Sequence, residues 1–406
     1  MPRIEEQRID GSGHGKVMFL PPMEPYGAPL LAGVFRSIGY DAHVLEENEA
    51  TLALGMKHTG GGECVPCPTT TGALLAAMQE RKLPPEKVIF FMPTACGPCR
   101  FGQYAKLASI IFDKLGWGQI QIMSPSAENA YEGVPEKARM RMWHAILVGD
   151  IMRKLTHKTR PYEKNPGETD QVVWEWMAHL VTAFEQEDVD PVQRILADAV
   201  DAVAKIAKRD EKRPLVGVVG EIYVRSDPFI NNKVCRCIEE LGGEAALAPV
   251  SEWILYTNHL RGLITKEQER GFKAIKEKVH LWLETNFFFE KWEHRYYEIA
   301  DPVLHDRKEY PIVEVMEEGM KYLPWQFEGE AVLTLGRAAF YVKRDGAKAV
   351  VNASPMFCMP GTVTTSIFAS FEEEMQVPVI CNFYDDSGDP NRSLVPMMHY
   401  LCKDER

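Results

Sequence analysis

The chain has 406 residues, of which 45% are hydrophobic and 26% are charged, and its formal net charge is -12 at pH 7. These values are typical of a globular protein with a large core, and no window approaches the roughly 18 consecutive apolar residues of a membrane span. The acidic balance argues against a nucleic-acid partner, because phosphate binding needs clustered Lys and Arg.

The first residues are charged and not apolar, so we expect no secretory signal. The nine cysteines are then expected in a reducing compartment, the cytoplasm, where disulfides are rare.

Alternating strands and helices predict a first α/β lobe with a parallel sheet within residues 1–135. The expected strands are 16–20, 41–45, 88–91 and 120–123, and the expected helices include one ending at Gly39 and one over 101–115. Residues 136–213 are rich in Ala, Trp and charge and predict a helical connector, interrupted by a turn over 160–167.

A second α/β lobe is predicted over residues 214–406. Its expected strands are 214–220, 245–249, 349–352 and 377–383, with helices between 251 and 285 and over 362–375. Asp227 and Pro228 are expected to cap and begin a further helix. The predicted fold is therefore two doubly wound, Rossmann-like lobes with mostly parallel sheets, joined by the helical connector.

Three cysteine segments lie in Gly- and Pro-rich turns next to apolar runs. They contain Cys64 and Cys67, then Cys96 and Cys99, and finally Cys358. Ligands of open α/β sheets bind beyond the carboxyl ends of the strands, and helix N-termini stabilise thiolates there. Short Cys-x2-Cys spacing with adjacent proline is typical of iron-sulfur sites, so the five thiols predict an iron-sulfur cluster in the cleft between the lobes.

Two alternatives explain the same cysteines. Two Cys-x2-Cys pairs are compatible with structural zinc, although their separation of 28 residues is longer than usual and zinc normally stabilises small modules. The tetrapeptide from Cys96 to Cys99 also resembles a thioredoxin-like dithiol, but that interpretation leaves Cys64, Cys67 and Cys358 unexplained. Cys235, Cys237, Cys381 and Cys402 are expected to be structural.

Four segments of the chain resemble a known group of proteins. They are Glu63-Cys64-Val65-Pro66-Cys67-Pro68 with the following threonines, Gly97-Pro98-Cys99-Arg100-Phe101-Gly102, 217–225 and 249–257. Over nearly its whole length the chain is similar to the dehydratase-related portion of the large acyl-CoA dehydratase activase proteins. That group is related to the 2-hydroxyacyl-CoA dehydratase subunits and to double-cubane cluster proteins.

The resemblance implies an oxygen-sensitive iron-sulfur protein of an anaerobe that receives low-potential electrons from a separate ATP-hydrolysing activase. It implies Cys64, Cys99 and Cys358 as cluster ligands, one from each segment. Cys67 and Cys96 either complete the shell of a 4Fe-4S cluster or bind the second cubane of an 8Fe-9S cluster. It further implies reductive or radical chemistry of the dehydratase type, and pairing with a homologous subunit or with a second copy of the chain.

A non-catalytic electron relay or scaffold with a structural metal is the alternative to an enzyme. The two differ in one respect that a structure can address, because an enzyme needs an apolar cavity beside the metal. No residue of the sequence by itself indicates the substrate.

Overall fold

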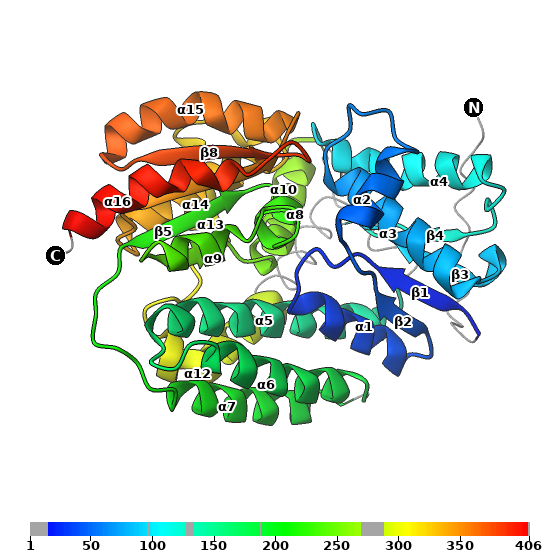
Figure 1. Cartoon of the computed structure of the whole chain (residues 1–406), viewed down its shortest axis with the longest axis horizontal. Helices are drawn as coiled ribbons and strands as arrows, with labels where there is room; N and C mark the ends of the chain where they lie inside the picture. The colour runs from blue at the N-terminus through cyan, green and yellow to red at the C-terminus, as the bar shows by residue number, and fades with distance from the viewer. Residues whose placement is uncertain (1–14, 96, 127–133, 187, 269–287, 405–406) are drawn as a thin grey trace.

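A computed structural model of the protein describes residues 15–95, 97–126, 134–186, 188–268 and 288–404. Two parallel sheets lie side by side, and a layer of helices lies along one side of both (Figure 1). The prediction of two doubly wound lobes is confirmed by this arrangement.

The first sheet has four parallel strands in the order β2-β1-β3-β4. They are β1 (Val17–Leu20), β2 (Asp41–Val44), β3 (Val88–Phe91) and β4 (Gln121–Met123). Val17 pairs with both Asp41 and Val88, which fixes the register of the three neighbouring strands. All four residues of β3 are buried, as expected for a central strand covered on both faces.

Alternate residues of the central strands enter two different cores. Phe19 and Phe90 pack with α3 (Pro66–Arg81) and α4 (Tyr104–Lys114), which cover one face. Met18 and Phe91 pack on the other face with α1 (Gly27–Ser37) and the helical layer. This alternation follows from the two-residue period of a strand.

A close helix pair positions the first cysteine segment. Helix α2 (Glu49–Met56) begins with a capping box between Asn48 and Thr51 and packs on α3. A Cβ atom built on Gly72 of α3 would lie 1.9 Å from the carbonyl oxygen of Thr51, so only glycine permits this approach. Cys64 directly precedes Val65, the N-cap residue of α3.

The second sheet repeats the order of the first, as β6-β5-β7-β8. Its strands are β5 (Leu215–Gly220), β6 (Glu244–Leu247), β7 (Ala349–Pro355) and β8 (Val379–Tyr384). Helices α9 (Val234–Glu240) and α16 (Leu394–Asp404) cover one face, and α14 (Ala331–Lys343) and α15 (Met359–Met375) cover the other. In both lobes the topological switch point therefore lies between the first and third strands.

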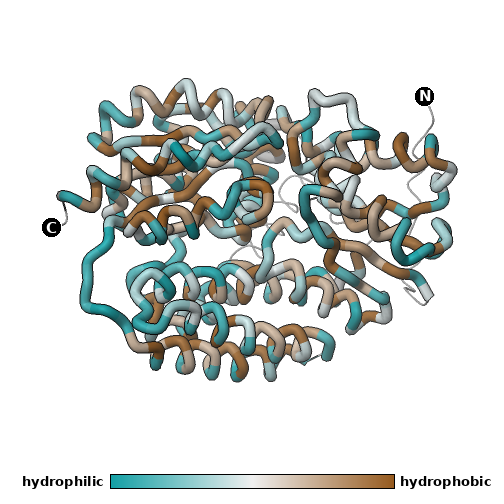
Figure 2. Tube along the Cα trace, viewed as in Figure 1, coloured by the Kyte–Doolittle hydropathy of each residue, from teal (hydrophilic) through white to brown (hydrophobic). Residues whose placement is uncertain are grey.

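The helical layer consists of α5 (Glu136–Thr159), α6 (Glu168–Phe184), α7 (Asp190–Ala204) and α12 (Glu290–Leu304). Residues Val192, Leu196 and Val203 form part of one buried stripe of α7, with the spacing of a helix face. Because α12 packs on α5 and α7, a segment beyond residue 213 also contributes to this layer. The hydrophilic stretch 205–214 connects the layer to β5 (Figure 2).

Two further helices lie in the second half of the chain, α10 (Ser251–Gln268) and α13 (Ile312–Met320). The helices expected between 251 and 285 are only partly testable, since 269–287 lie outside the described residues. Within the ranges that the structure does describe, no helix has the length and apolar character needed to cross a membrane.

One predicted helix begins later than expected. A short helix α8 (Ile222–Ser226) follows β5, and Asp227 accepts hydrogen bonds from the backbone of Phe229 and Ile230 in a turn. Asn232 and Lys233 then have positive φ angles of 51° and 57°, so the helix cannot start before Val234. Asp227 therefore caps a turn and not a long helix.

Candidate functional site

The second and third cysteine segments occupy equivalent positions in the two lobes. Cys99 follows β3 and caps the short helix Arg100–Gln103 that leads into α4. Cys358 follows β7 and is the N-cap residue of α15. Both segments thus follow the third strand of their sheet and lie at its switch point.

Contacts between the lobes bring these segments to one place. A Cβ atom built on Gly329 would be 3.6 Å from the Cγ atoms of both Pro98 and Pro360. Gly97, with a φ of 80°, packs against Glu328. On the other side, the guanidinium of Arg100 donates a hydrogen bond to the carbonyl oxygen of Gly62, which holds the first two segments together.

The thiols of Cys64, Cys99 and Cys358 share their electrostatic environment. The Glu221 carboxylate raises the pKa of all three, although burial is the larger cause in each case. Cys64 acts in turn on the pKa of Cys99 and of Cys358. The three side chains predicted as ligands, one from each segment, therefore lie within electrostatic reach of one another.

Each thiol is strongly disfavoured as a free thiolate. Burial raises the pKa of Cys99 to about 12 and raises the pKa of Cys358 further. Some compensation comes from hydrogen bonds, since the backbone N–H of Gly361 donates to the Cys358 Sγ at 3.4 Å and Tyr104 donates to Cys64. Deprotonation therefore requires a cation close to the sulfur atoms.

Cys67 packs in the same core as Cys64, but Glu221 is not among the causes that raise its pKa. It lies inside the first turn of α3, is 1% exposed, and packs in the core that covers one face of the first sheet. Burial is the largest cause that raises its pKa, to about 12, followed by Glu63 and Cys64. The expectation of a turn holds for Cys64 but not for Cys67. Cys96 lies outside the described residues.

The remaining cysteines lie away from this place. Cys235 and Cys237 are on α9 in the core of the second lobe, where Cys235 is the more buried of the two. Cys381 is in β8 and Cys402 is in α16. These positions agree with structural roles.

Two buried glutamates at the site were not predicted from the sequence. Glu221 follows β5 directly, and Glu330 precedes α14. Burial raises the pKa of each, and Arg225 lies 3.7 Å from the Glu330 Oε1. Both line a narrow polar crevice with Cys358, Asn352 and Ser354. Arg225 is buried and donates to the carbonyl oxygens of Gly220 and Pro249.

The described side chains do not form a ready site for a single metal ion. A tetrahedral zinc site would require sulfur atoms about 4 Å apart, given Zn–S bonds of about 2.3 Å. Among the side chains that the structure describes, no group of three or more His, Cys, Asp or Glu is close enough to hold one metal ion. Cysteine thiolates are the ligands that iron-sulfur clusters use, so three thiols from neighbouring segments are of the right type for one.

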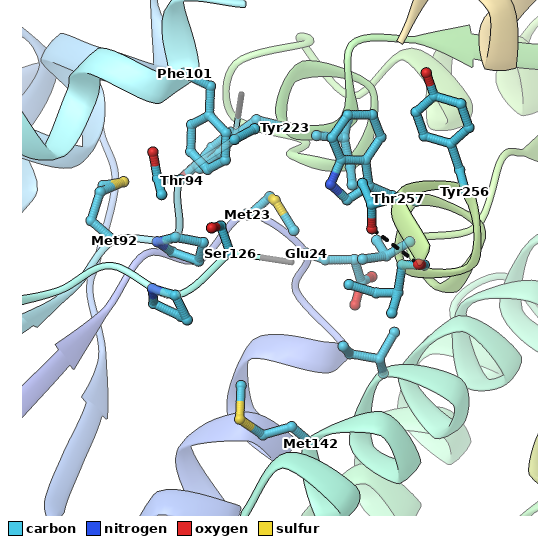
Figure 3. Close-up of a pocket in the computed structure, with 18 of the residues that line it drawn as sticks. Met23, Glu24, Met92, Thr94, Phe101, Ser126, Met142, Tyr223, Tyr256 and Thr257 are labelled. Atoms are coloured by element: carbon cyan, nitrogen blue, oxygen red, sulfur yellow. Dashed lines mark hydrogen bonds between the residues drawn. The ribbon is translucent and has the colours of Figure 1, made fainter. Parts of the chain in front are cut away.

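A cavity of about 490 Å³ lies beside the cysteine segments. Its wall includes Thr94 and Ala95, Phe101, and Ile222 and Tyr223, which flank or adjoin the site residues. Helix α10 closes the other side through Trp253, Tyr256 and Thr257 (Figure 3). Most of the lining is apolar, as in binding sites for small organic molecules.

No family model matches the chain, and no curated protein matches it.

Proposed function

We propose that this protein is an iron-sulfur protein that accepts low-potential electrons from a separate ATP-hydrolysing activase. Cys64, Cys99 and Cys358 hold the cluster at the junction of the two lobes. The electrons serve reductive or radical chemistry of the 2-hydroxyacyl-CoA dehydratase type. The protein works in the cytoplasm of an anaerobe, with a homologous subunit or a second copy as partner.

The observation that carries the proposal is the meeting of three cysteine segments from both lobes. Cys99 and Cys358 follow equivalent strands, and Pro98 and Pro360, one residue before Cys99 and two after Cys358, both contact Gly329. Buried cysteines that merely fill a core have no reason to gather at two switch points. The resemblance to the acyl-CoA dehydratase group, made on the same segments, supports the same ligands.

The protein side chains prepare the site for a cationic group. An iron-sulfur cluster, when bound, supplies a low-potential one-electron couple. The thiols must lose their protons to bind it, and the N-termini of α3 and α15, which begin beside Cys64 and Cys358, favour the resulting negative charge. The Glu221 carboxylate raises the pKa of the thiols, and so it disfavours a thiolate that no cation neutralises. Cys64 and Cys358 are 5% and 3% exposed, which limits the access of water to them, while Cys99 is partly exposed.

The apolar cavity favours an enzyme over a scaffold. A structural metal needs no space beside it, whereas a catalytic cluster must reach a substrate. The cavity is lined by residues adjoining both the second cysteine segment and Glu221. A small organic substrate can therefore lie next to the place where the thiols meet.

The test is metal and sulfide analysis of protein purified without oxygen, with EPR spectra before and after dithionite. About four irons with equal sulfide, and a signal that appears on reduction, would support a single cubane. About eight irons would favour the double-cubane cluster, with Cys67 and Cys96 as further ligands. Zinc, or no metal, would contradict the proposal and leave the structural-metal or dithiol alternatives.

A further inference from the structure

Glu24 is the unusual polar residue of the cavity wall. It follows β1, in the first lobe, as Glu221 follows β5 in the second. The residue is 4% exposed, and its Oε2 accepts a hydrogen bond from the backbone N–H of Gly27 at the start of α1. Within the described part of the chain, its Oε1 has no hydrogen-bond partner.

Three hydroxyl groups of the wall have partners in the protein. Tyr223 donates to Glu47 at 2.6 Å, Tyr256 donates to the Gly329 carbonyl oxygen at 2.6 Å, and Thr257 donates to the Ile254 carbonyl oxygen at 3.0 Å. A buried oxygen without a partner costs free energy. Glu24 is a wall residue whose buried carboxyl group has hydrogen-bonding capacity to spare.

The nearest cation does not satisfy this oxygen. Arg153 Nη1 lies 3.7 Å from Glu24 Oε1, too far for a hydrogen bond, while Arg153 Nη2 donates to Asp150 at 2.8 Å. Asp150 also accepts hydrogen bonds from the backbone N–H groups of Val250 and Ser251, so the carboxylate to which Arg153 donates is fixed in place. Glu24 lines the cavity, and the last torsion of its side chain is soft, so its carboxyl group can turn to meet a bound ligand.

We propose that this cavity binds a neutral carbonyl compound whose apolar body lies against Phe101 and Trp253 and whose carbonyl oxygen accepts a hydrogen bond from Glu24. The proposal gives the electron acceptor a substrate class, and it rests on the proposed function for that role. The binding itself rests only on the cavity and on Glu24. A cavity of about 490 Å³ is within the size range of sites for such molecules.

The charge state of Glu24 supports this assignment. Burial raises its pKa to about 7, with Arg153 opposing and Asp150 adding to the shift. The protonated carboxyl group donates a hydrogen bond, and the carboxylate cannot. Tyr26, Tyr223 and Tyr256 also face this region and remain neutral near pH 7, because burial raises the pKa of each. Arg261 and Glu328 also line the cavity.

The experiment is a titration of the full chain with acetophenone and with ethylbenzene, which has the same shape without the carbonyl group. Binding is followed by ligand-observed NMR at about pH 6 and about pH 8. We expect acetophenone to bind about tenfold more tightly at the lower pH, as the fraction of protonated Glu24 predicts. Ethylbenzene binding should not depend on pH.

Glu24→Gln keeps a hydrogen-bond donor but cannot titrate, so acetophenone should bind this variant equally at both pH values. Trp253→Ala should weaken both probes at both pH values. Glu175→Gln, on the exposed side of α6, is the matched control and should behave as the wild type. Absence of saturable binding, or an unchanged pH dependence in Glu24→Gln, would overturn the proposal. If the protein holds no iron but still binds acetophenone in this way, the binding site stands and only the proposed electron-accepting function is contradicted.

Discussion

Pro98 of the first lobe and Pro360 of the second both lie beside Gly329. A Cβ atom built on Gly329 would be 3.6 Å from the Cγ atom of each proline. Gly329 has a φ of 66°, so its backbone conformation also favours glycine. The segment before α14 therefore packs between two cysteine segments. A Cβ atom there would make ordinary van der Waals contact with both prolines, so the positive φ, and any atom beyond Cβ, disfavours a larger residue at the candidate cluster.

Gly329→Val should separate the two cysteine segments. The substitution adds backbone strain on the order of 1 to 3 kcal/mol and places methyl groups against both prolines. We expect the iron content after anaerobic purification to fall to about half or less. Gly346→Val is the control, because Gly346 has a φ of 73° and nothing within 4 Å of its Cβ position. Equal iron contents in the two variants would show that Gly329 does not set the approach.

A second prediction concerns a carboxyl pair that joins the lobes. Burial and then Asp227 raise the pKa of Glu47 to about 10, and Tyr223 donates to Glu47. The folded protein keeps a proton here that the unfolded chain releases above about pH 4, so the free energy of unfolding falls as the pH rises from about 4 to about 10.

Glu47→Gln removes this dependence because the amide cannot ionise. The variant should be more stable than the wild type by on the order of 2 kcal/mol at about pH 8.5, with little difference at about pH 5. Urea unfolding at both pH values measures this. Glu46→Gln, at an exposed position, should give no such difference. A stability difference of the same size at both pH values would rule out the shared proton.

The strands were the most predictable part of the fold. Val88–Phe91 and Leu215–Gly220 are continuous apolar runs, which are typical of strands covered on both faces. The start of α9 was not predictable, because Asp227 and Pro228 form a local cap signal that the positive φ angles of Asn232 and Lys233 override. Local patterns do not reveal such backbone reversals.

The cysteines of the candidate site were predicted from the sequence, and its buried glutamates were not. Cys99 and Cys358 follow apolar runs and precede helices, so the strand-end rule predicts their place. Glu221 and Glu24 also follow central strands, and the same rule could have identified them. Glu330 carries no such signal, because it reaches the thiols only through the packing of α14 on the second sheet.

A third prediction concerns the helix pair that holds Cys64. Gly72→Ala would place a Cβ atom 1.9 Å from the Thr51 carbonyl oxygen, so α2 and α3 must move apart. We expect a loss of stability of about 3 kcal/mol and a lower iron content, both measured on anaerobically purified protein. Gly62→Ala adds a Cβ atom with nothing within 4 Å and should leave both unchanged. Wild-type stability of Gly72→Ala would contradict the close approach.

The central claim is that Cys64, Cys99 and Cys358 together hold one iron-sulfur centre, and the most direct measurement is the iron content of their alanine variants. Each variant should retain less than about half of the wild-type iron when purified without oxygen, because each removes a ligand. Cys402→Ala, on α16, should retain all of it. Full iron content in Cys358→Ala would contradict the account, since the second lobe would then contribute no cysteine from the predicted set.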